Sequence, residues 1–213
     1  MRRLPVYLVL DTSGSMTGEP IESVKNGVQM LVSALRQDPY ALETAYLSVI
    51  TFDSSARQVV PLTELSMFQT PDLVATGTTA LGDALNVVCQ SISSEVAKTT
   101  TDTKGDWKPM VFIFTDGVPT DDWSKSLSNY QSQSIGVTVA CAAGPQADTS
   151  VLKQITEIVV QLDTADSSSI AAFFKWVSAS ISTGSQKVES GSDIDLTKSS
   201  ELPPPPPEIN LVV

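Results

Sequence analysis

The sequence contains no histidine and only two cysteines, and each shortage removes a class of function. Without imidazole the chain cannot build a Ser-His-Asp triad, a Cys-His dyad or a histidine-ligated zinc site. Cys89 and Cys141 each lie inside an apolar stretch, which indicates two small core residues rather than a disulfide. Whatever the chain does, it does with side chains other than imidazole.

Basic residues and long apolar runs are also scarce. Lys and Arg total 13 against 24 Asp and Glu, which gives a net charge of -11. Because phosphate-backbone binding rests on clustered basic residues, we expect no nucleic acid partner. No apolar run approaches the roughly 20 residues that cross a bilayer, so we expect no membrane partner. Pro5 and Asp11 bound the first apolar run and no small-residue cleavage site follows, which favours a cytoplasmic protein without a signal peptide.

What the sequence does have is a regular alternation of strand-length apolar runs with segments of helical period. This alternation predicts an α/β fold, doubly wound, with a mostly parallel central sheet and helices on both faces. The segment 58–62 follows the strand at 46–53 after a short connection, so we expect a hairpin that adds one antiparallel edge strand. The other expected strands are 4–10, 110–115, 136–143 and 159–162. The expected helices are one from Pro20 to the Asp38-Pro39 pair, one capped by Thr78 or Thr79, and those at 121–133, 149–158 and 168–181.

The composition changes past Thr183, first to Ser, Gly, Asp, Glu and Lys and then to a proline run at 203–207. We therefore expect one domain over residues 1–183 and a flexible, proline-containing C-terminal tail over residues 184–213, with a stiff polyproline II piece. Proline runs are typical both of spacers and of segments that bind partners, and the composition does not separate the two.

The most informative motif stands where the first strand ends. Asp11, Ser13 and Ser15 form an Asp-x-Ser-x-Ser set directly after the apolar run at 6–10. One carboxylate and two hydroxyls at alternate positions are hard oxygen donors suited to a divalent cation. The motif precedes a helix, at the carboxyl edge where open α/β sheets place their ligands.

Two further segments are expected at the same edge of the sheet. Gly77-Thr78-Thr79 begins a helix with a hydroxyl donor, and Thr115-Asp116-Gly117 ends the strongest strand with a carboxylate. Together the three loops supply two carboxylates and three hydroxyls, which are the oxygen ligands that Mg²⁺ or Mn²⁺ prefers. The candidate metal ligands are Asp11, Ser13, Ser15, Thr79 and Asp116. Such a set leaves a divalent cation able to accept one more anionic oxygen, which an Asp or Glu of a partner protein would supply.

The motif set resembles a von Willebrand factor type A (VWA) domain that carries a metal-ion-dependent adhesion site. The Asp-x-Ser-x-Ser motif, the threonine of a Gly-x-Thr loop and the strand-end aspartate all find matches, over about residues 4–182. By the spacing to Ala84-Leu85, Thr79 fits the family's metal-linked threonine better than Thr78. The resemblance implies a competent metal site and a protein-binding function.

Within the family, the segment 8–16 and the loop Gly-Thr-Thr-Ala-Leu-Gly are similar to bacterial tellurite-resistance TerY proteins. This narrower resemblance implies a cytosolic stress-response scaffold that works with other tellurite-resistance proteins. It also implies a protein kinase and a phosphatase as partners. Nothing in the composition or the spacing itself points to tellurium chemistry.

Other interpretations of the same residues stay open. Singly, the hydroxyls could be helix caps and Asp116 a turn residue. A strand-end Asp11 beside Mg²⁺ also resembles phosphotransferases of the haloacid dehalogenase type, which makes a metal-dependent phosphatase the enzymatic alternative. Those enzymes carry a second aspartate two residues on as general acid, and here that position is Ser13, so we expect no enzyme. A third alternative is a scaffold that acts through its proline-rich tail.

Several polar and aromatic residues are candidates for secondary roles. Asp53, Asp121 and Asp122 could shape the rim of the carboxyl edge or be simply solvated. Trp107 and Trp123 could anchor an interface or be partly buried.

Overall fold

A seven-stranded sheet in the order β3-β2-β1-β4-β5-β6-β7 forms the centre of the computed structural model, which describes residues 2–189 and 202–212. Strands β1, β2, β4, β5 and β6 run parallel, while β3 and the short β7 pair antiparallel at the two edges. The strands are β1 Leu4–Asp11, β2 Ala45–Phe52, β3 Ala56–Glu64, β4 Met110–Thr115, β5 Val137–Ala143, β6 Ile158–Leu162 and β7 Asn210–Leu211. The predicted fold class, with its antiparallel hairpin edge at β3, is confirmed.

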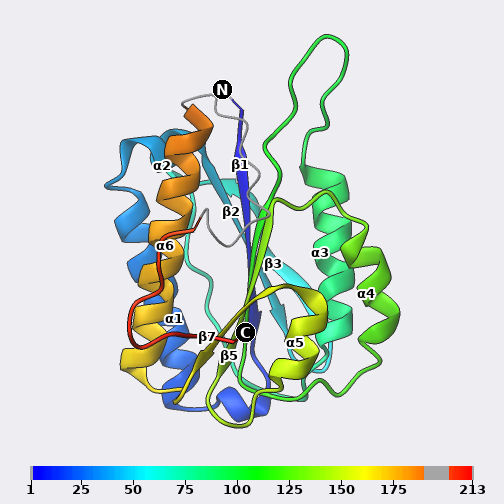
Figure 1. The fold of residues 1–213 in the computed structure, drawn as a ribbon, viewed down its shortest axis with the longest axis vertical. Coiled ribbons are helices and arrows are strands. Elements are labelled where there is room, and N and C mark those ends of the chain that lie inside the picture. Colours follow the sequence, from blue (N-terminus) through cyan, green and yellow to red (C-terminus); the bar gives the residue numbers. More distant parts are fainter. Residues whose placement is uncertain (1, 190–201, 213) are drawn as a thin grey trace.

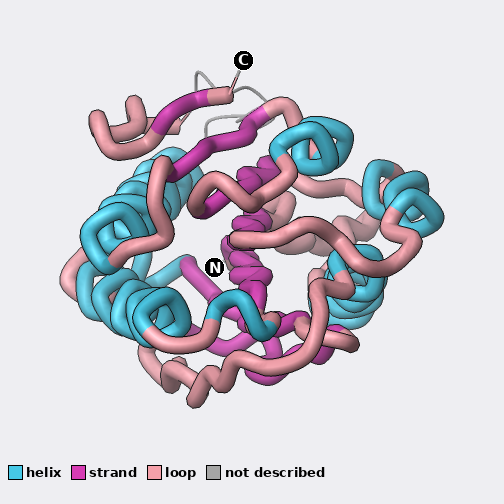
Figure 2. The backbone as a smooth tube through the Cα atoms, turned by 90° about the horizontal axis from the view of Figure 1, so that it is seen from below, coloured by secondary structure: helices cyan, strands magenta, loops and turns pink. Residues whose placement is uncertain are grey.

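Helices cover both faces of the sheet (Figures 1 and 2). Helices α1, α2 and α6 pack on one face and α3, α4 and α5 on the other, each group over its own apolar core. The helices are the short 3₁₀ turn η1 Gly14–Met16, α1 Glu19–Leu35, α2 Pro39–Thr44, α3 Leu81–Glu95, α4 Ser124–Gln131, α5 Thr149–Ile155 and α6 Ser167–Glu189. Among the described residues, no helix is both long and apolar enough to cross a membrane.

The central strands are buried along their whole length because helices lie on both sides of them. Every residue of β1 and of β4 is buried, which explains why these strands read as continuous apolar runs in the sequence. In β3, at the edge, half-buried and exposed positions alternate over most of the strand instead, and none is fully buried. The chain leaves β1 toward β2 and β3 on one side, and leaves β4 toward β5 and β6 on the other. The carboxyl ends of β1 and β4 are therefore the point where the winding reverses, and such points form ligand-binding crevices.

Two helix starts differ from expectation. Asp38 was expected only to end the first helix, but it also begins the short α2, a helix that was not predicted. Its carboxylate accepts hydrogen bonds from the backbone amides of Tyr40 and Ala41 and so caps α2.

The expected cap of α3 by Thr78 or Thr79 is wrong, because α3 begins after Ala80 without a side-chain cap from its own segment. The amides of Gly82 and Asp83 donate instead to Asp121, at 3.1 and 2.9 Å.

The C-terminal region also differs from expectation. Helix α6 continues beyond Thr183 to Glu189. The segment 202–212 lies against the domain: β7 pairs with β6, Ile209 is buried, and Trp176 Nε1 donates to the carbonyl of Pro203 at 2.8 Å. The expected flexible tail is thus docked where the structure describes it, and its part at 190–201 lies outside the described residues.

Candidate metal centre

Asp11 occupies the end of β1 and is fixed on both carboxylate oxygens. Its side chain is completely buried. Oδ1 accepts a hydrogen bond from the backbone amide of Ser13 at 2.8 Å, and Oδ2 accepts one from the hydroxyl of Thr115 at 2.6 Å. Strand β4 lies beside β1 and supplies Thr115 as its last residue. The carboxylate is therefore held in one orientation by its own loop and by the neighbouring strand.

A chain of oxygen atoms connects the first loop to Asp116. The hydroxyls of Ser13 and Ser15 lie 3.0 Å apart, and the hydroxyl of Ser15 donates to Asp116 Oδ1 at 2.7 Å. Gly14 N donates to the carbonyl of Gly77 at 3.0 Å and so ties the first loop to the second. Figure 2 looks at this edge of the sheet from below. The loops after β1 and β4, far apart in the sequence, meet at one point as predicted.

Thr79, rather than Thr78, faces this point. Thr79 is buried, and its hydroxyl lies 3.3 Å from where a Cβ on Gly117 would stand. The hydroxyl of Ser15 lies 3.9 Å from the same place, so the two hydroxyls border one space. Thr78 is exposed, and its hydroxyl and amide both donate to the hydroxyl of Ser54. The structure therefore brings the candidate ligands to one edge of the sheet, with the hydroxyl of Thr79, and not that of Thr78, beside Gly117.

The two carboxylates lie where negative charge is disfavoured. Burial raises the pKa of Asp11, the hydrogen bonds from Ser13 and Thr115 oppose that rise, and the charge of Asp116 adds to it. Burial also raises the pKa of Asp116, against the hydrogen bond from Ser15. A bound cation would favour the ionised form of both groups, so the site gains from a positive charge.

The donor set and its spacing fit a small, hard cation. Among the residues that the structure describes, no group of three or more His, Cys, Asp or Glu side chains could hold a metal, so the candidate set depends on hydroxyls beside its two carboxylates. Adjacent ligands of an octahedral cation at 2.0–2.1 Å are about 2.9 Å apart. The Ser13–Ser15 and Ser15–Asp116 oxygen pairs, at 3.0 and 2.7 Å, lie close to that spacing. The residues present therefore fit a divalent cation with oxygen ligands.

Thr115 is the functional residue that the sequence analysis missed. Its hydroxyl donates to Asp11 and so positions a candidate ligand without belonging to the motif. Strand register was the signal that could have found it. Leu10 pairs with Phe114, which places the next residues, Asp11 and Thr115, side by side at the strand ends.

The secondary candidates have structural roles. Asp53 forms an ion pair with Arg57 at 3.1 Å, and Asp122 forms one with Lys125 at 2.7 Å. Trp107 and Trp123 are both half-buried, and each packs against one of the two apolar cores.

Comparison with protein families gives a match to the von Willebrand factor type A domain over residues 6–175. The chain belongs to the von Willebrand factor type A family. A curated relative of this VWA chain is the uncharacterized protein sll0103 of Synechocystis sp., 36% identical over 123 residues. That alignment covers 54% of the present chain and 26% of the relative, so the VWA chain spans about a quarter of that protein.

Solved structures share the fold of this VWA domain at low sequence identity. A von Willebrand factor type A protein from Catenulispora acidiphila has a TM-score of 0.67 at 16% identity and covers 85% of this chain and 43% of its own. The pilus adhesin SpaC from Lactobacillus rhamnosus GG has a TM-score of 0.69 at 15% identity, over 86% and 31%. Proximal thread matrix protein 1 of the mussel byssus, solved with a zinc-occupied MIDAS motif, has a TM-score of 0.60 at 21% identity, over 86% and 46%. These likenesses establish the fold.

Proposed function

We propose that this VWA domain binds a divalent cation, Mg²⁺ or Mn²⁺, and uses it to bind a carboxylate of a partner protein. The observation that carries the proposal is the meeting of two buried carboxylates and three hydroxyls at the point where the winding of the sheet reverses. The five residues are Asp11, Ser13, Ser15, Thr79 and Asp116. The zinc-occupied MIDAS motif of the mussel byssus protein, which has the same fold, supports it.

The proposed ligands fall into two kinds, charged and neutral. Asp11 and Asp116 would supply the negative charge, and the Ser13, Ser15 and Thr79 hydroxyls would supply neutral donors. A cation held this way keeps a net positive charge and room for one further anionic oxygen, which is the chemistry that an Asp or Glu of a partner satisfies. The relation to a pilus adhesin of the same fold fits a binding role.

We further propose that the chain is not an enzyme. In the phosphatase alternative, Asp11 would attack a phosphoester, and a second acid two residues on would protonate the leaving group. Here Asp11 is buried, both its oxygens accept hydrogen bonds, and the residue two positions on is Ser13. We expect no turnover of a generic phosphoester in the presence of Mg²⁺. Turnover that disappears in Asp11→Asn would contradict this.

The wider role that we propose is a cytosolic scaffold in bacterial tellurite and stress resistance, with other tellurite-resistance proteins, a kinase and a phosphatase as partners. Its support is the resemblance of the segment 8–16 and of the Gly-Thr-Thr-Ala-Leu-Gly loop to TerY proteins. The test is growth on tellurite of a bacterial strain that lacks the gene. Complementation by the wild type but not by Asp11→Asn would support a metal-dependent role, whereas equal growth of the strain with and without the gene would contradict it.

The first experiment is a calorimetric titration of the full chain with MgCl₂ and with MnCl₂. We expect binding by the wild type and loss of detectable binding in Asp11→Asn, because the variant removes one of the two charges. Asp122→Asn is the matched control, since Asp122 follows β4, as Asp116 does, but is exposed and paired with Lys125. Equal affinity of Asp11→Asn and the wild type would overturn the proposal.

The same variant allows folding to be checked separately from binding. Because burial already penalises the charge of Asp11, its neutralisation should leave the metal-free domain at least as stable as the wild type. Chemical denaturation in chelator measures this. An unfolded Asp11→Asn would make the calorimetric result uninformative, and Ser15→Ala would then replace it, since Ser15 is exposed and bridges Ser13 to Asp116.

A further inference from the structure

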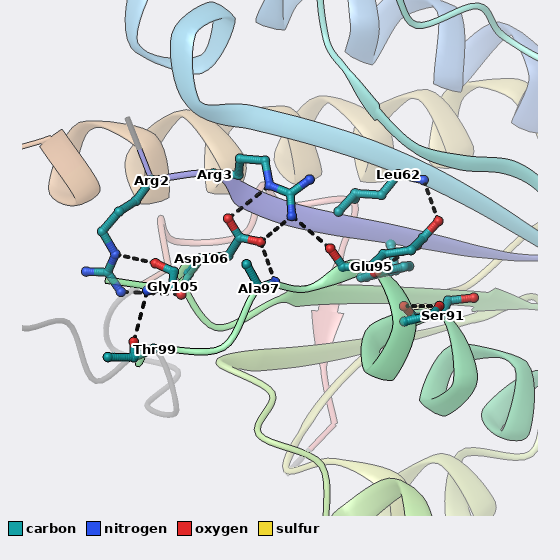
Figure 3. A network of polar contacts seen from close by, with 11 residues as sticks. Arg2, Arg3, Leu62, Ser91, Glu95, Ala97, Thr99, Gly105 and Asp106 are labelled. Atoms are coloured by element: carbon teal, nitrogen blue, oxygen red, sulfur yellow. Dashed lines mark hydrogen bonds and ion pairs between the residues drawn. The ribbon is translucent and has the colours of Figure 1, made fainter. Parts of the chain in front are cut away.

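The amino ends of the strands, opposite the candidate metal centre, carry a second organised polar region (Figure 3). Arg3 forms an ion pair with Asp106 and also donates to the carbonyl of Glu95 at 2.8 Å. The second oxygen of Asp106 also accepts from the amide of Ala97 at 2.7 Å. Both oxygens of this carboxylate are thus engaged inside the protein. They tie the end of α3 to the long loop that leads to β4.

That loop projects from the upper end of the molecule in Figure 1, and its base is tightly closed. Asp106 N donates to the carbonyl of Ala97 at 2.8 Å, and Gly105 N donates to the hydroxyl of Thr99 at 3.1 Å. A Cβ on Gly105 would lie 2.3 Å from the oxygen of Ala97 and 2.5 Å from the nitrogen of Thr99, so only glycine allows the two sides of the loop to approach this closely. The base of the loop, formed by residues 97–99 and 105–106, is therefore ordered, and we call it the wall.

Arg2 and Trp107 extend this wall. The guanidinium carbon of Arg2 lies 3.8 Å from the centre of the Trp107 ring, which is a cation–π contact. Arg2 Nε also donates to the carbonyl of Gly105 at 2.7 Å. Arg2 Nη2 donates to the carbonyl of Asp106 at 3.3 Å as well, so three contacts hold the guanidinium at this position. A cation that is already positioned costs less side-chain entropy when a ligand binds.

The wall borders a hollow with a volume of about 890 Å³. Three basic side chains line it: Arg2, Lys98 and Lys108. Its apolar lining includes Ile92, Val96 and Pro109. Asp106, already bonded to Arg3, is the one acidic residue that lines it. Within residues 2–189 and 202–212, neither Lys98 nor Lys108 makes a hydrogen bond or an ion pair.

A second hollow of about 600 Å³ continues from the first, since Gln133 and Gly136 line both. It passes the first residues of β5 and β6, Val137 and Ile158, and reaches the end of α5 at Ile155. The two hollows form one groove across the amino ends of β4, β5 and β6. A groove of this length suits an extended chain better than a compact small molecule, which proteins usually enclose.

We propose that this groove binds an extended, acidic segment of a partner protein. The chain carries a net charge of -11, yet three of its 13 basic side chains line the first hollow, whose one carboxylate, that of Asp106, is paired with Arg3. The second hollow is lined by Glu157 and by no basic residue, so the acidic side chains of the segment belong in the first. Carboxylates of the segment lie at Arg2, Lys98 and Lys108, and its apolar side chains cover Ile92 and Val96. β1 separates this groove from the metal centre by about 25 Å, given its eight residues. One domain then holds two partners at opposite ends.

The test uses the full chain in chelator, so that no carboxylate can bind through a metal and the result is independent of the metal site. The probe is a fluorescein-labelled peptide of alternating Glu and Val, followed by fluorescence anisotropy. We expect binding that weakens as salt is added. The double variant Lys98→Glu/Lys108→Glu should weaken it by at least about tenfold, because each reversal replaces an attraction by a repulsion.

The matched control is Lys104→Glu/Lys175→Glu, which changes the net charge equally. Both lysines are exposed, and neither lines the groove, although Lys104 belongs to the same loop. Equal weakening by the two double variants would overturn the proposal, because the attraction would then be unspecific. Binding of a peptide with Gln in place of Glu at equal affinity would also overturn it, since the occupant would not be acidic. Absence of any binding by the wild type would have the same meaning.

Discussion

The acidic side chains at the two ends of the sheet have opposite electrostatic surroundings. At the amino end, Asp106 faces Arg3; its burial opposes ionisation, but the hydrogen bonds and the charge of Arg3 outweigh burial and lower its pKa. At the carboxyl end, Asp11 and Asp116 face hydroxyls, and burial raises the pKa of both. A folded domain therefore stabilises one carboxylate and leaves two others short of positive charge.

This difference in neighbouring charge distinguishes carboxylates that stabilise the fold from carboxylates that can bind a cation. A carboxylate already satisfied by an arginine has little to gain from a further cation. A buried pair of carboxylates that is held only by neutral hydroxyl and amide groups gains stability when a cation binds. Burial alone would not distinguish these cases, because Asp11 and the side chain of Asp106 are both shielded from solvent. The charge of the neighbouring groups does distinguish them.

The sharpest test of the carboxyl end compares its two neighbouring threonines. Thr79→Val removes a hydroxyl that borders the proposed cation space, whereas Thr78→Val removes one that bonds to Ser54. We expect Thr79→Val to lower the affinity for Mn²⁺ by more than the roughly 10-fold to 100-fold typical of outer groups, and Thr78→Val to change it by less than about twofold. Calorimetric titration measures both. The reverse order would assign the metal-linked hydroxyl to Thr78.

A smaller effect is expected at Thr115. Thr115→Val keeps the shape and the β-branching of the side chain but removes its hydrogen bond to Asp11. The metal affinity should fall by roughly tenfold, as for other groups that orient a ligand. Thr138→Val in β5, which removes a partly buried hydroxyl contact to Tyr130 of α4, is the control and should leave the metal affinity unchanged. Equal loss in both variants would point to a general loosening of the sheet.

The smallest effect concerns the amino end and depends on pH. Asp106→Asn removes the charge that faces Arg3, so the free energy of unfolding at pH 7 should fall by about 1–3 kcal/mol. Because the folded-state pKa of Asp106 is lowered, its contribution is complete above the unfolded-state pKa of about 3.9 and is lost as the pH falls through the folded value. Urea unfolding at neutral and acidic pH should therefore show the two proteins converging. A difference that is constant with pH would contradict the assignment.

Much of the fold could be predicted from the sequence because central strands buried on both faces are continuous apolar runs. The strand at Met110–Thr115 was predicted at its observed bounds, and the meeting of the loop after β1 with Asp116 followed from the rule that parallel strands end at one edge. That a cation binds there stays a prediction. Asp11, Ser13 and Ser15 were found because their motif is local in sequence.

The misses share a different physical cause, which is contact over a long sequence distance. The cap of α3 comes from Asp121, on another loop, and the positioning of Asp11 comes from Thr115, on another strand. The docking of the segment 202–212 depends on Trp176 and on the free edge of β6. No local pattern of residue types encodes these pairings, because each is set by how elements already formed lie against each other.

The short strand β7 affects the tendency of this protein to aggregate through the edges of its sheet. An uncovered edge strand presents free backbone groups to which other chains can add. At one edge, β3 limits such growth with the register shifts of its pairing to β2 and with Pro61, which has no amide to donate. At the other edge, β6 has no proline, and the paired backbone of Leu211 covers it instead. The last residues of the described chain thus help to keep an apolar, strand-rich molecule from aggregating edge to edge.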